Sequence, residues 1–177
     1  MTRPTWEEYF VNMVNAVATR GTCDRGKAGA VIVKDNQVIS TGYVGSAAGD
    51  DHCDETGHKY EYRIKRWKRV HRTDYDGMHG GVISIITNED NISKHCIRTI
   101  HAEQNAICSA AKYGHSVQGS IMYTSMVPCR TCAMMIINSG ITKVVALKEY
   151  QTSEHTKELF KKCNIELIIL DSTLNNY

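Results

Sequence analysis

Residues 120–147, SIMYTSMVPCRTCAMMIINSGITKVVAL, decide the fold class of this 177-residue chain. Residues 120–124 and 143–147 are short apolar runs with β-branched side chains, and each predicts a strand. Between them, Pro128 fits the first turn of a helix and Gly140 fits its end. A strand, a helix and a second strand in this order indicate a parallel unit of an α/β domain.

The flanking sequence extends this pattern on both sides. Thr5 and Glu8 form a capping box that begins a helix running to about residue 20. Two β-branched runs, residues 29–34 and 37–41, predict a hairpin, whereas residues 45–91 keep no sustained period. Further elements are expected as helices at 101–113 and 153–162 and a strand at 165–170. We therefore expect one mostly parallel sheet covered by helices.

The composition is typical of a soluble globular domain, with 42% hydrophobic and 23% charged residues. The net charge of +2 argues against a protein that coats nucleic acid. No stretch approaches the roughly 18 apolar residues that span a bilayer, and the start of the chain lacks the apolar run of a secretory signal. We expect a single domain over residues 1–177, in the cytoplasm and away from membranes, with its seven cysteines as thiols.

Two short motifs carry the chemistry, His101-Ala-Glu103 and Pro128-Cys-Arg-Thr-Cys132. Cys129 and Cys132 are three residues apart at a helix start, so both thiols lie on one face of its first turn. The helix dipole there favours thiolates, which are the form that binds a metal. His101 can supply a third ligand. Three protein ligands leave the fourth tetrahedral position of a zinc ion for water, as in catalytic zinc sites.

Glu103 is the candidate catalytic residue. Two thiolates and a neutral imidazole cancel the double charge of zinc, so a separate carboxylate is needed to take a proton from water. Glu103 lies two residues from His101 and therefore points to a different side of the backbone. We expect it to pass the proton to a ring nitrogen and then to protonate a leaving amine. The pattern His-x-Glu followed by Pro-Cys-x-x-Cys is the signature of zinc deaminases, whereas a zinc ribbon would need a second close pair of Cys or His.

The chain resembles the bacterial and phage deoxycytidylate deaminases of the cytidine deaminase superfamily. The motifs that carry this resemblance are residues 22–33, 40–46, 95–101, 101–107 and 128–132, so it covers most of the chain outside about 59–90 and the last few residues. It implies a three-layer fold, a five-stranded mixed sheet with helices on both faces. It also implies hydrolysis of dCMP to dUMP and ammonia for thymidylate synthesis, in a homohexamer activated by dCTP and inhibited by dTTP. A phage-encoded chain would act in the host cytoplasm.

The resemblance also implies roles for individual residues. The backbone N–H of Ala102 would bind the pyrimidine carbonyl, the main-chain carbonyl of Ser125 would bind the amine, and Tyr150 would line the pocket. The residues expected near the regulatory nucleotide are Arg25, Lys27, Tyr43 and Gly45.

Val44 departs from the family pattern, which has an asparagine that bonds the sugar or the regulatory nucleotide. A valine side chain forms no hydrogen bond. Either another group recognises the sugar, or regulation is altered, or a backbone group substitutes while Val44 packs normally. The sequence leaves these alternatives open.

A second, structural zinc is also expected from the resemblance. Cys23 and Cys53 match positions that hold a non-catalytic zinc in some relatives, with His95 as the third ligand. His58 or Cys96 would complete the tetrahedron. The alternative is that buried cysteines serve as small apolar residues, which is common.

A basic insertion is expected over about residues 59–90. Residues 59–72 carry seven Lys and Arg against one acid, with Tyr60, Tyr62 and Trp67 interleaved. This pattern fits a contact with phosphate or single-stranded nucleic acid. The nearly balanced charge elsewhere favours a solvated segment whose aromatics pack on protein, and hence no nucleic-acid partner. Two alternative functions remain, a polynucleotide deaminase acting on tRNA adenosine or single-stranded DNA and an inactive zinc-binding module, which would have no use for Glu103.

Overall fold

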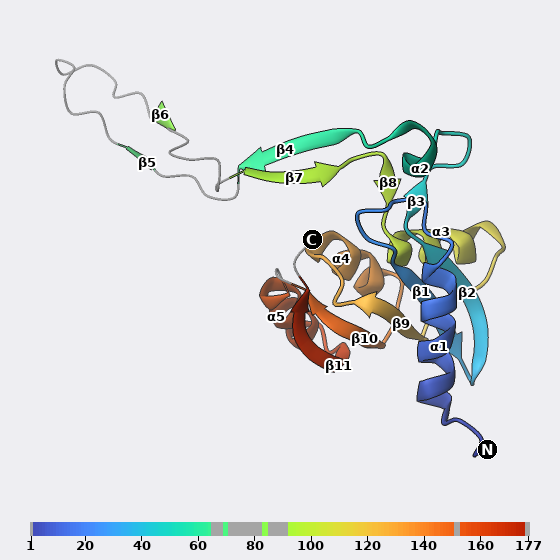
Figure 1. Ribbon diagram of the computed structural model, residues 1–177. Helices are drawn as coiled ribbons and strands as arrows, with labels where there is room; N and C mark the ends of the chain where they lie inside the picture. Colours follow the sequence, from blue (N-terminus) through green and yellow to red (C-terminus); the bar gives the residue numbers. More distant parts are fainter. Residues whose placement is uncertain (1, 65–68, 71–82, 85–91, 151–152, 176–177) are drawn as a thin grey trace. The chain divides into compact units, whose positions relative to one another are not determined.

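The computed structural model describes residues 2–64, 69–70, 83–84, 92–150 and 153–175. The chain divides into two compact units, one made of Met1–Gly57 with Arg98–Tyr177 and the other of His58–Ile97. The first unit contains the large sheet and both zinc motifs (Figure 1). The second unit overlaps the range of the expected insertion. Within the described residues, no helix has the length and apolar character needed to cross a membrane.

A five-stranded sheet in the order β11-β10-β9-β1-β2 forms the centre of the first unit. Its strands are β1 (Gly29–Lys34), β2 (Gln37–Tyr43), β9 (Ile121–Met126), β10 (Lys143–Tyr150) and β11 (Glu166–Asn175). The expected parallel unit is present, because β10 runs parallel to both β9 and β11. However, β1 runs antiparallel to β2 and to β9, so the expectation of a mostly parallel sheet was wrong. The five-stranded mixed sheet implied by the resemblance is confirmed.

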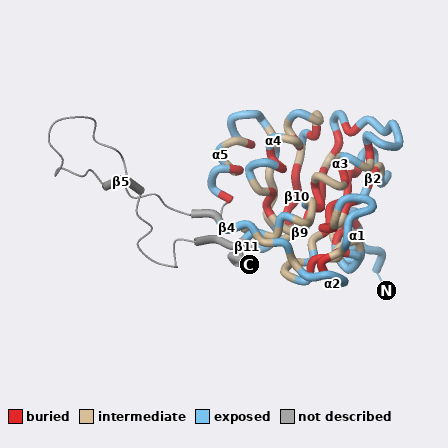
Figure 2. The backbone as a smooth tube through the Cα atoms, turned by 90° about the horizontal axis from the view of Figure 1, so that it is seen from above, coloured by how far each residue is buried: buried red, intermediate tan, exposed pale blue. Residues whose placement is uncertain are grey.

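Helices cover both faces of this sheet (Figure 1). The residues of β1 alternate between two hydrophobic cores, as expected for a strand that is buried on both faces. Val31 and Val33 face a core with Phe10 and Val14 of α1 (Trp6–Ala18). Ala30 and Ile32 face the other core. That core is formed with α3 (Ala102–Lys112), α4 (Arg130–Asn138) and α5 (Glu154–Lys162). Buried residues accordingly follow the middle of the sheet in Figure 2.

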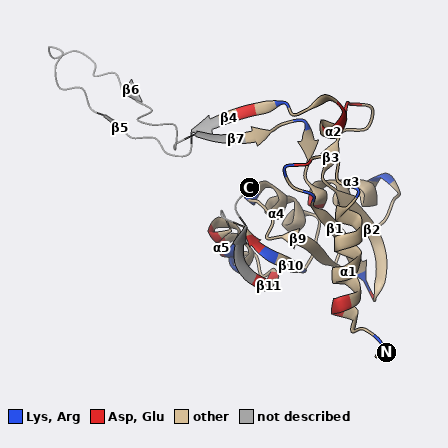
Figure 3. Ribbon diagram, viewed as in Figure 1, with Lys and Arg blue, Asp and Glu red and all other residues tan. Residues whose placement is uncertain are grey.

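The helix starts follow the sequence signals closely. The capping box of α1 is confirmed, because Thr5 Oγ1 accepts from the backbone N–H of Glu8 and the Glu8 carboxylate accepts from the backbone N–H of Thr5. Acidic residues at this end of α1 appear red in Figure 3 and complement the helix dipole. Cys129 is the N-cap of α4, so Pro128 lies just outside the helix and not in its first turn. Strand β10 extends to Tyr150 and is therefore longer than the strand predicted at 143–147.

Short elements fill the segment for which no period was apparent. In the first unit, α2 (Cys53–Thr56) follows β3 (Gly45–Ser46), which pairs with β8 (Thr99–Ile100). The second unit is a two-stranded antiparallel ribbon of β4 (Tyr60–Ile64) and β7 (Ile92–Cys96), with a further short pair, β5 (Arg69–Val70) and β6 (Ile83–Ser84). Most of the basic stretch at 59–72, including Trp67, lies outside the residues whose side chains the structure describes, and so does the hypothesis of a nucleic-acid contact.

Candidate active site and metal centres

The turn that carries the two cysteines is held from two sides. Strand β9 ends beside β10, where the backbone N–H of Val127 donates to the carbonyl of Lys148 at 2.9 Å. The next carbonyl, that of Pro128, accepts a hydrogen bond of 2.9 Å from Thr156 Oγ1 of α5, and the Thr156 side chain is fully buried. These contacts fix the chain just before Cys129 begins α4.

The histidine is placed by the start of α3. His101 is the N-cap residue of this helix and directly follows β8. Its backbone N–H donates to Gln104 Oε1 at 3.2 Å, which stabilises the first turn. Ala102 and Glu103 are the next two residues, and both are buried.

The three expected zinc ligands lie together. His101 Nδ1 is 3.6 Å from Cys129 Sγ and 3.4 Å from Cys132 Sγ. A tetrahedral ion with zinc–sulfur and zinc–nitrogen bonds of standard length would place a ligand nitrogen about 3.6 Å from a ligand sulfur. The distances therefore fit a zinc ion bound through Nδ1 and the two sulfurs. His101 is exposed, whereas Cys132 is fully buried, so the group is open toward solvent on one side.

The thiols of this group are unequal before metal binds. A hydrogen bond from Cys132, helped by one from His101, lowers the pKa of Cys129 to about 4. The neighbouring Cys129 and burial together raise the pKa of Cys132. The hydrogen bond to Cys129 also raises the pKa of His101. The two cysteines therefore share a thiolate at neutral pH, and metal binding would displace the remaining thiol proton.

Glu103 lies beside this group without belonging to it. The three-residue ligand set does not include its carboxylate, and its side chain is only 8% exposed. Burial raises the pKa of Glu103, an effect that the charge of His101 opposes. A carboxylate whose pKa is shifted toward neutrality, next to a metal with an open position, is suited to take up and give back protons.

The three expected substrate contacts lie on three different elements of the sheet and its helices. Ala102 is the first residue of α3, where the helix supplies no carbonyl to its backbone N–H. Ser125 is next to last in β9, and its hydroxyl bonds the backbone of Gly29, which leaves the main-chain carbonyl as its candidate contact. Tyr150 is half-buried at the end of β10, where its carbonyl accepts from the N–H of Ser153. These roles remain predictions.

The four residues expected near a regulatory nucleotide belong to two segments that meet. The backbone N–H of Val44 donates to the carbonyl of Ala28, and the N–H of Thr22 donates to the carbonyl of Val44, each at 3.0 Å. The loop that carries Arg25 and Lys27 is therefore bonded to the turn formed by Tyr43, Val44 and Gly45. The Val44 side chain is 9% exposed and lies next to Gly21. This placement favours the alternative in which Val44 packs normally.

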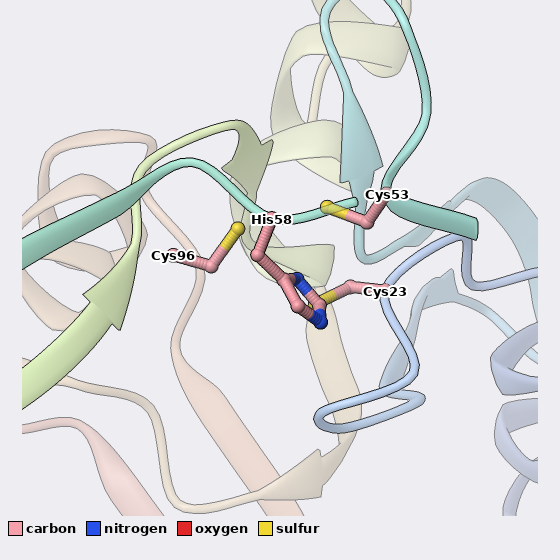
Figure 4. A group of neighbouring side chains, drawn as sticks. All are labelled: Cys23, Cys53, His58 and Cys96. Atoms are coloured by element: carbon pink, nitrogen blue, oxygen red, sulfur yellow. The ribbon is translucent and has the colours of Figure 1, made fainter. Parts of the chain in front are cut away.

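A second group of metal-binding side chains is formed by Cys23, Cys53, His58 and Cys96. One ligand atom from each lies within 4.8 Å of the others, and Figure 4 shows the four side chains turned toward a common centre. Both alternatives for the fourth ligand, His58 and Cys96, are thus in the group. His95 is not in it. In strand β7 His95 precedes Cys96, and successive side chains of a strand point to opposite faces.

Thr156 is a residue of this site that the sequence did not indicate. Its hydrogen bond to Pro128 links residues that are 28 positions apart, and no local motif predicts such a contact. A hydroxyl side chain within the helix predicted at 153–162 is the only signal the sequence offers, and it is a weak one.

Comparisons with known proteins agree with this geometry. Residues 4–148 match the model of the cytidine and deoxycytidylate deaminase zinc-binding region. The chain is 32% identical to the ComE operon protein 2 of Bacillus subtilis over 98% of its own length and 77% of that protein. It is also 32% identical to the deoxycytidylate deaminase of Mycobacterium phage D29, over 84% of its own length and 99% of the phage protein.

A solved structure shares the fold. The dCMP deaminase of the cyanophage S-TIM5, determined in complex with dCMP and dUMP, superposes with a TM-score of 0.65 at 22% identity, over 96% of this chain and 99% of that one. The match of the family model over most of the chain, together with the geometry of His101, Cys129 and Cys132, shows that this chain belongs to the cytidine and deoxycytidylate deaminase zinc-binding family.

Proposed function

We propose that this chain hydrolyses dCMP to dUMP and ammonia with a zinc ion held by His101, Cys129 and Cys132. The observation that carries the proposal is the fit of these three side chains to a tetrahedral zinc, with a buried carboxylate outside the ligand set. The similarity to several deoxycytidylate deaminases supports dCMP as the substrate.

The residues of the chain divide the chemistry between them. His101, Cys129 and Cys132 would hold the zinc ion, which would keep a fourth position for water and make that water more acidic. Glu103 takes a proton from the water while the water oxygen bonds to C4 of the pyrimidine. Glu103 then delivers this proton to N3. It then carries the remaining proton of the new C4 hydroxyl to the amino group, and the C4–N4 bond breaks to release ammonia and leave the C4 carbonyl of dUMP. The backbone N–H of Ala102 and the carbonyl of Ser125 orient the ring.

The test is ammonia release from purified chain over a matched panel of cytidine, dCMP, CMP, dCTP, a cytosine-containing single-stranded oligonucleotide and an adenosine-containing tRNA stem-loop. We expect turnover of dCMP to dominate. Turnover of an oligonucleotide or the stem-loop, with none of the mononucleotides, would instead identify a polynucleotide deaminase. No turnover of any of them by zinc-loaded chain would favour the inactive binding module.

A structural zinc held by Cys23, Cys53, His58 and Cys96 is a second part of this proposal. Three sulfurs and one imidazole nitrogen are a common structural zinc set, and all four ligands come from the protein, which leaves no position for water. His58 precedes β4, and Cys96 ends β7 opposite Tyr60. A zinc ion bound to both would stabilise the end of a two-stranded ribbon, which is marginally stable alone.

Zinc content measured by elemental analysis tests the second site. We expect two zinc ions per wild-type chain and one in Cys96→Ser. The matched control is His95→Ala, which changes the neighbouring residue on the opposite face of β7 and should keep both ions. A wild-type chain with one zinc ion, or a His95→Ala variant that loses zinc as Cys96→Ser does, would contradict this ligand set.

Regulation, assembly and location complete the proposal. The loop of Arg25 and Lys27, bonded to the turn of Tyr43 and Gly45, is the candidate site for dCTP as activator and dTTP as inhibitor. We propose a homohexamer, as the resemblance implies, in a reducing cytoplasm that keeps the cysteines as thiols. Kinetics with and without each effector, and mass measured by light scattering, test the first two points.

A further inference from the structure

The side chain of Asn105 makes a contact near the active site that neither the zinc ligands nor the proton transfer uses. Asn105 lies on α3 two residues after Glu103. Its Nδ2 donates a hydrogen bond of 2.8 Å to the carbonyl oxygen of Tyr43, and the bond is partly buried. Because Tyr43 ends β2, this bond joins the catalytic helix to residues 43–46, which we call the β2–β3 turn.

The β2–β3 turn and Gly42, the residue that precedes it, contact the chain on the two sides of His101. Before His101, Ile100 pairs with Gly45 in the short ladder of β3 and β8. After His101, the backbone of α3 approaches Gly42 so closely that a methyl group there would lie 2.3 Å from the carbonyl oxygen of Ala102. The turn therefore lies beside the chain segment that carries His101 and Glu103, where a nucleotide bound for deamination would lie.

The same turn is tied to the strand that leads into the cysteine motif. Tyr43 pairs with Gly29 at the end of the β1–β2 ladder. The backbone N–H of Gly29 in turn donates to Ser125 Oγ at 2.9 Å. The bond from Asn105 thus closes a path that runs from one zinc motif through the turn to the other.

We propose that Asn105 is a positioning residue that holds the β2–β3 turn as one wall of the site that binds the substrate dCMP. This inference rests on the proposed deamination of dCMP. Helix α3 is held independently, because Ser40 Oγ donates to the Ala106 carbonyl at 2.7 Å in a buried bond and because Ala106 and Ala110 belong to the core. Loss of the Asn105 bond therefore releases the turn and leaves Glu103 and His101 in place. Substrate binding weakens, while proton transfer does not.

The experiment compares Asn105→Ala and Asn105→Asp with the matched control Ser40→Ala in steady-state kinetics on dCMP. Asp keeps the shape of Asn, but its carboxylate cannot donate to the Tyr43 carbonyl. A net hydrogen bond of ordinary strength corresponds to a change of about three- to tenfold. We expect both Asn105 variants to raise KM by about three- to tenfold with kcat and zinc content near wild type. Ser40→Ala removes a bond between the same two elements farther from the site, and it should lower thermal stability without changing KM.

The outcomes separate the inference from the proposed function. An active wild-type chain whose KM is unchanged in Asn105→Ala overturns the inference alone. A normal KM in Asn105→Asp with a raised KM in Asn105→Ala also overturns it, because the side chain would then act by packing. An equal rise of KM in Ser40→Ala would assign the effect to general loosening of α3 and likewise refute the inference. A wild-type chain inactive on dCMP overturns the proposed function, and the inference with it.

Discussion

Gly42 is a position at which a single added methyl group should disturb the active site as well as the stability of the fold. A Cβ atom at Gly42 would lie 2.3 Å from the Ala102 carbonyl oxygen, 2.3 Å from the Ala106 nitrogen and 2.8 Å from the Asn105 carbonyl carbon. All three atoms belong to the backbone of α3, so the clash cannot be relieved by rotation of a side chain. In Gly42→Ala, β2 and the first turn of α3 must therefore move apart.

The size of this movement follows from the contact distances. Ordinary van der Waals contact begins near 3.4 Å, so the backbones must separate by about 1 Å. The turn that moves carries His101 and Glu103, and a misplacement of about 1 Å can lower the rate of an enzyme by about 100-fold. A loss of this size corresponds to about 2.7 kcal/mol of transition-state stabilisation. Overpacking should also lower the free energy of unfolding by about 1–3 kcal/mol.

The assay is kcat/KM for dCMP, measured with zinc-loaded protein well below its melting temperature. The matched control is Gly119→Ala. Gly119 has a φ of +72° and no neighbouring atom within 4 Å of an added Cβ, so its substitution costs stability through backbone strain alone. It precedes β9 at the end remote from Ser125. We expect Gly119→Ala to melt earlier but to keep wild-type kcat/KM. A Gly42→Ala protein with kcat/KM within twofold of wild type would refute the reasoning.

Three further predictions concern the zinc site itself. Glu103→Gln should lower kcat by about 100- to 10,000-fold without changing zinc content, since only the proton carrier is lost; normal turnover would exclude Glu103 as that carrier. Thr156→Val leaves the buried Pro128 carbonyl without its hydroxyl donor and should lower the free energy of unfolding in urea by about 1–3 kcal/mol; an unchanged midpoint would contradict this. Because His101, Cys129 and Cys132 must all be deprotonated to bind zinc, release to a chromophoric chelator should speed up as pH falls; a rate independent of pH would count against this ligand set.

The sequence predicted those parts of the site that depend on local spacing. His101, Glu103, Cys129 and Cys132 lie within two motifs at helix starts, and the spacing within each motif places its own residues together at that helix start. The capping box of α1 was predictable for the same reason, because its partners are three residues apart. Contacts between distant segments were not. The bond from Asn105 to Tyr43 spans 62 residues, and its donor resembles any other polar residue on a helix.

The errors have the same physical origin. A mostly parallel sheet was expected because strands alternate with helices after the predicted hairpin, yet β1 pairs antiparallel with β9. This pairing joins residues about 90 positions apart, and neither strand carries a local sequence signal for it. His95 was expected as a ligand from the resemblance to relatives that hold a second zinc. The alternation of side chains along β7 decides between His95 and Cys96, and the register of that strand was not visible in the sequence.

The base of the β4–β7 ribbon has a consequence for how this chain tolerates changes in length. The backbone N–H of Ile97 donates to the carbonyl of Lys59 at 2.8 Å. The chain therefore enters the ribbon and leaves it at two points that lie next to each other. Residues can therefore be added or removed at the far end of such a ribbon without altering the spacing of its two stems, and each doubling of the connecting loop costs only about 0.6 kcal/mol in closure entropy. The ribbon is consequently a natural place to graft a foreign peptide or to trim the chain.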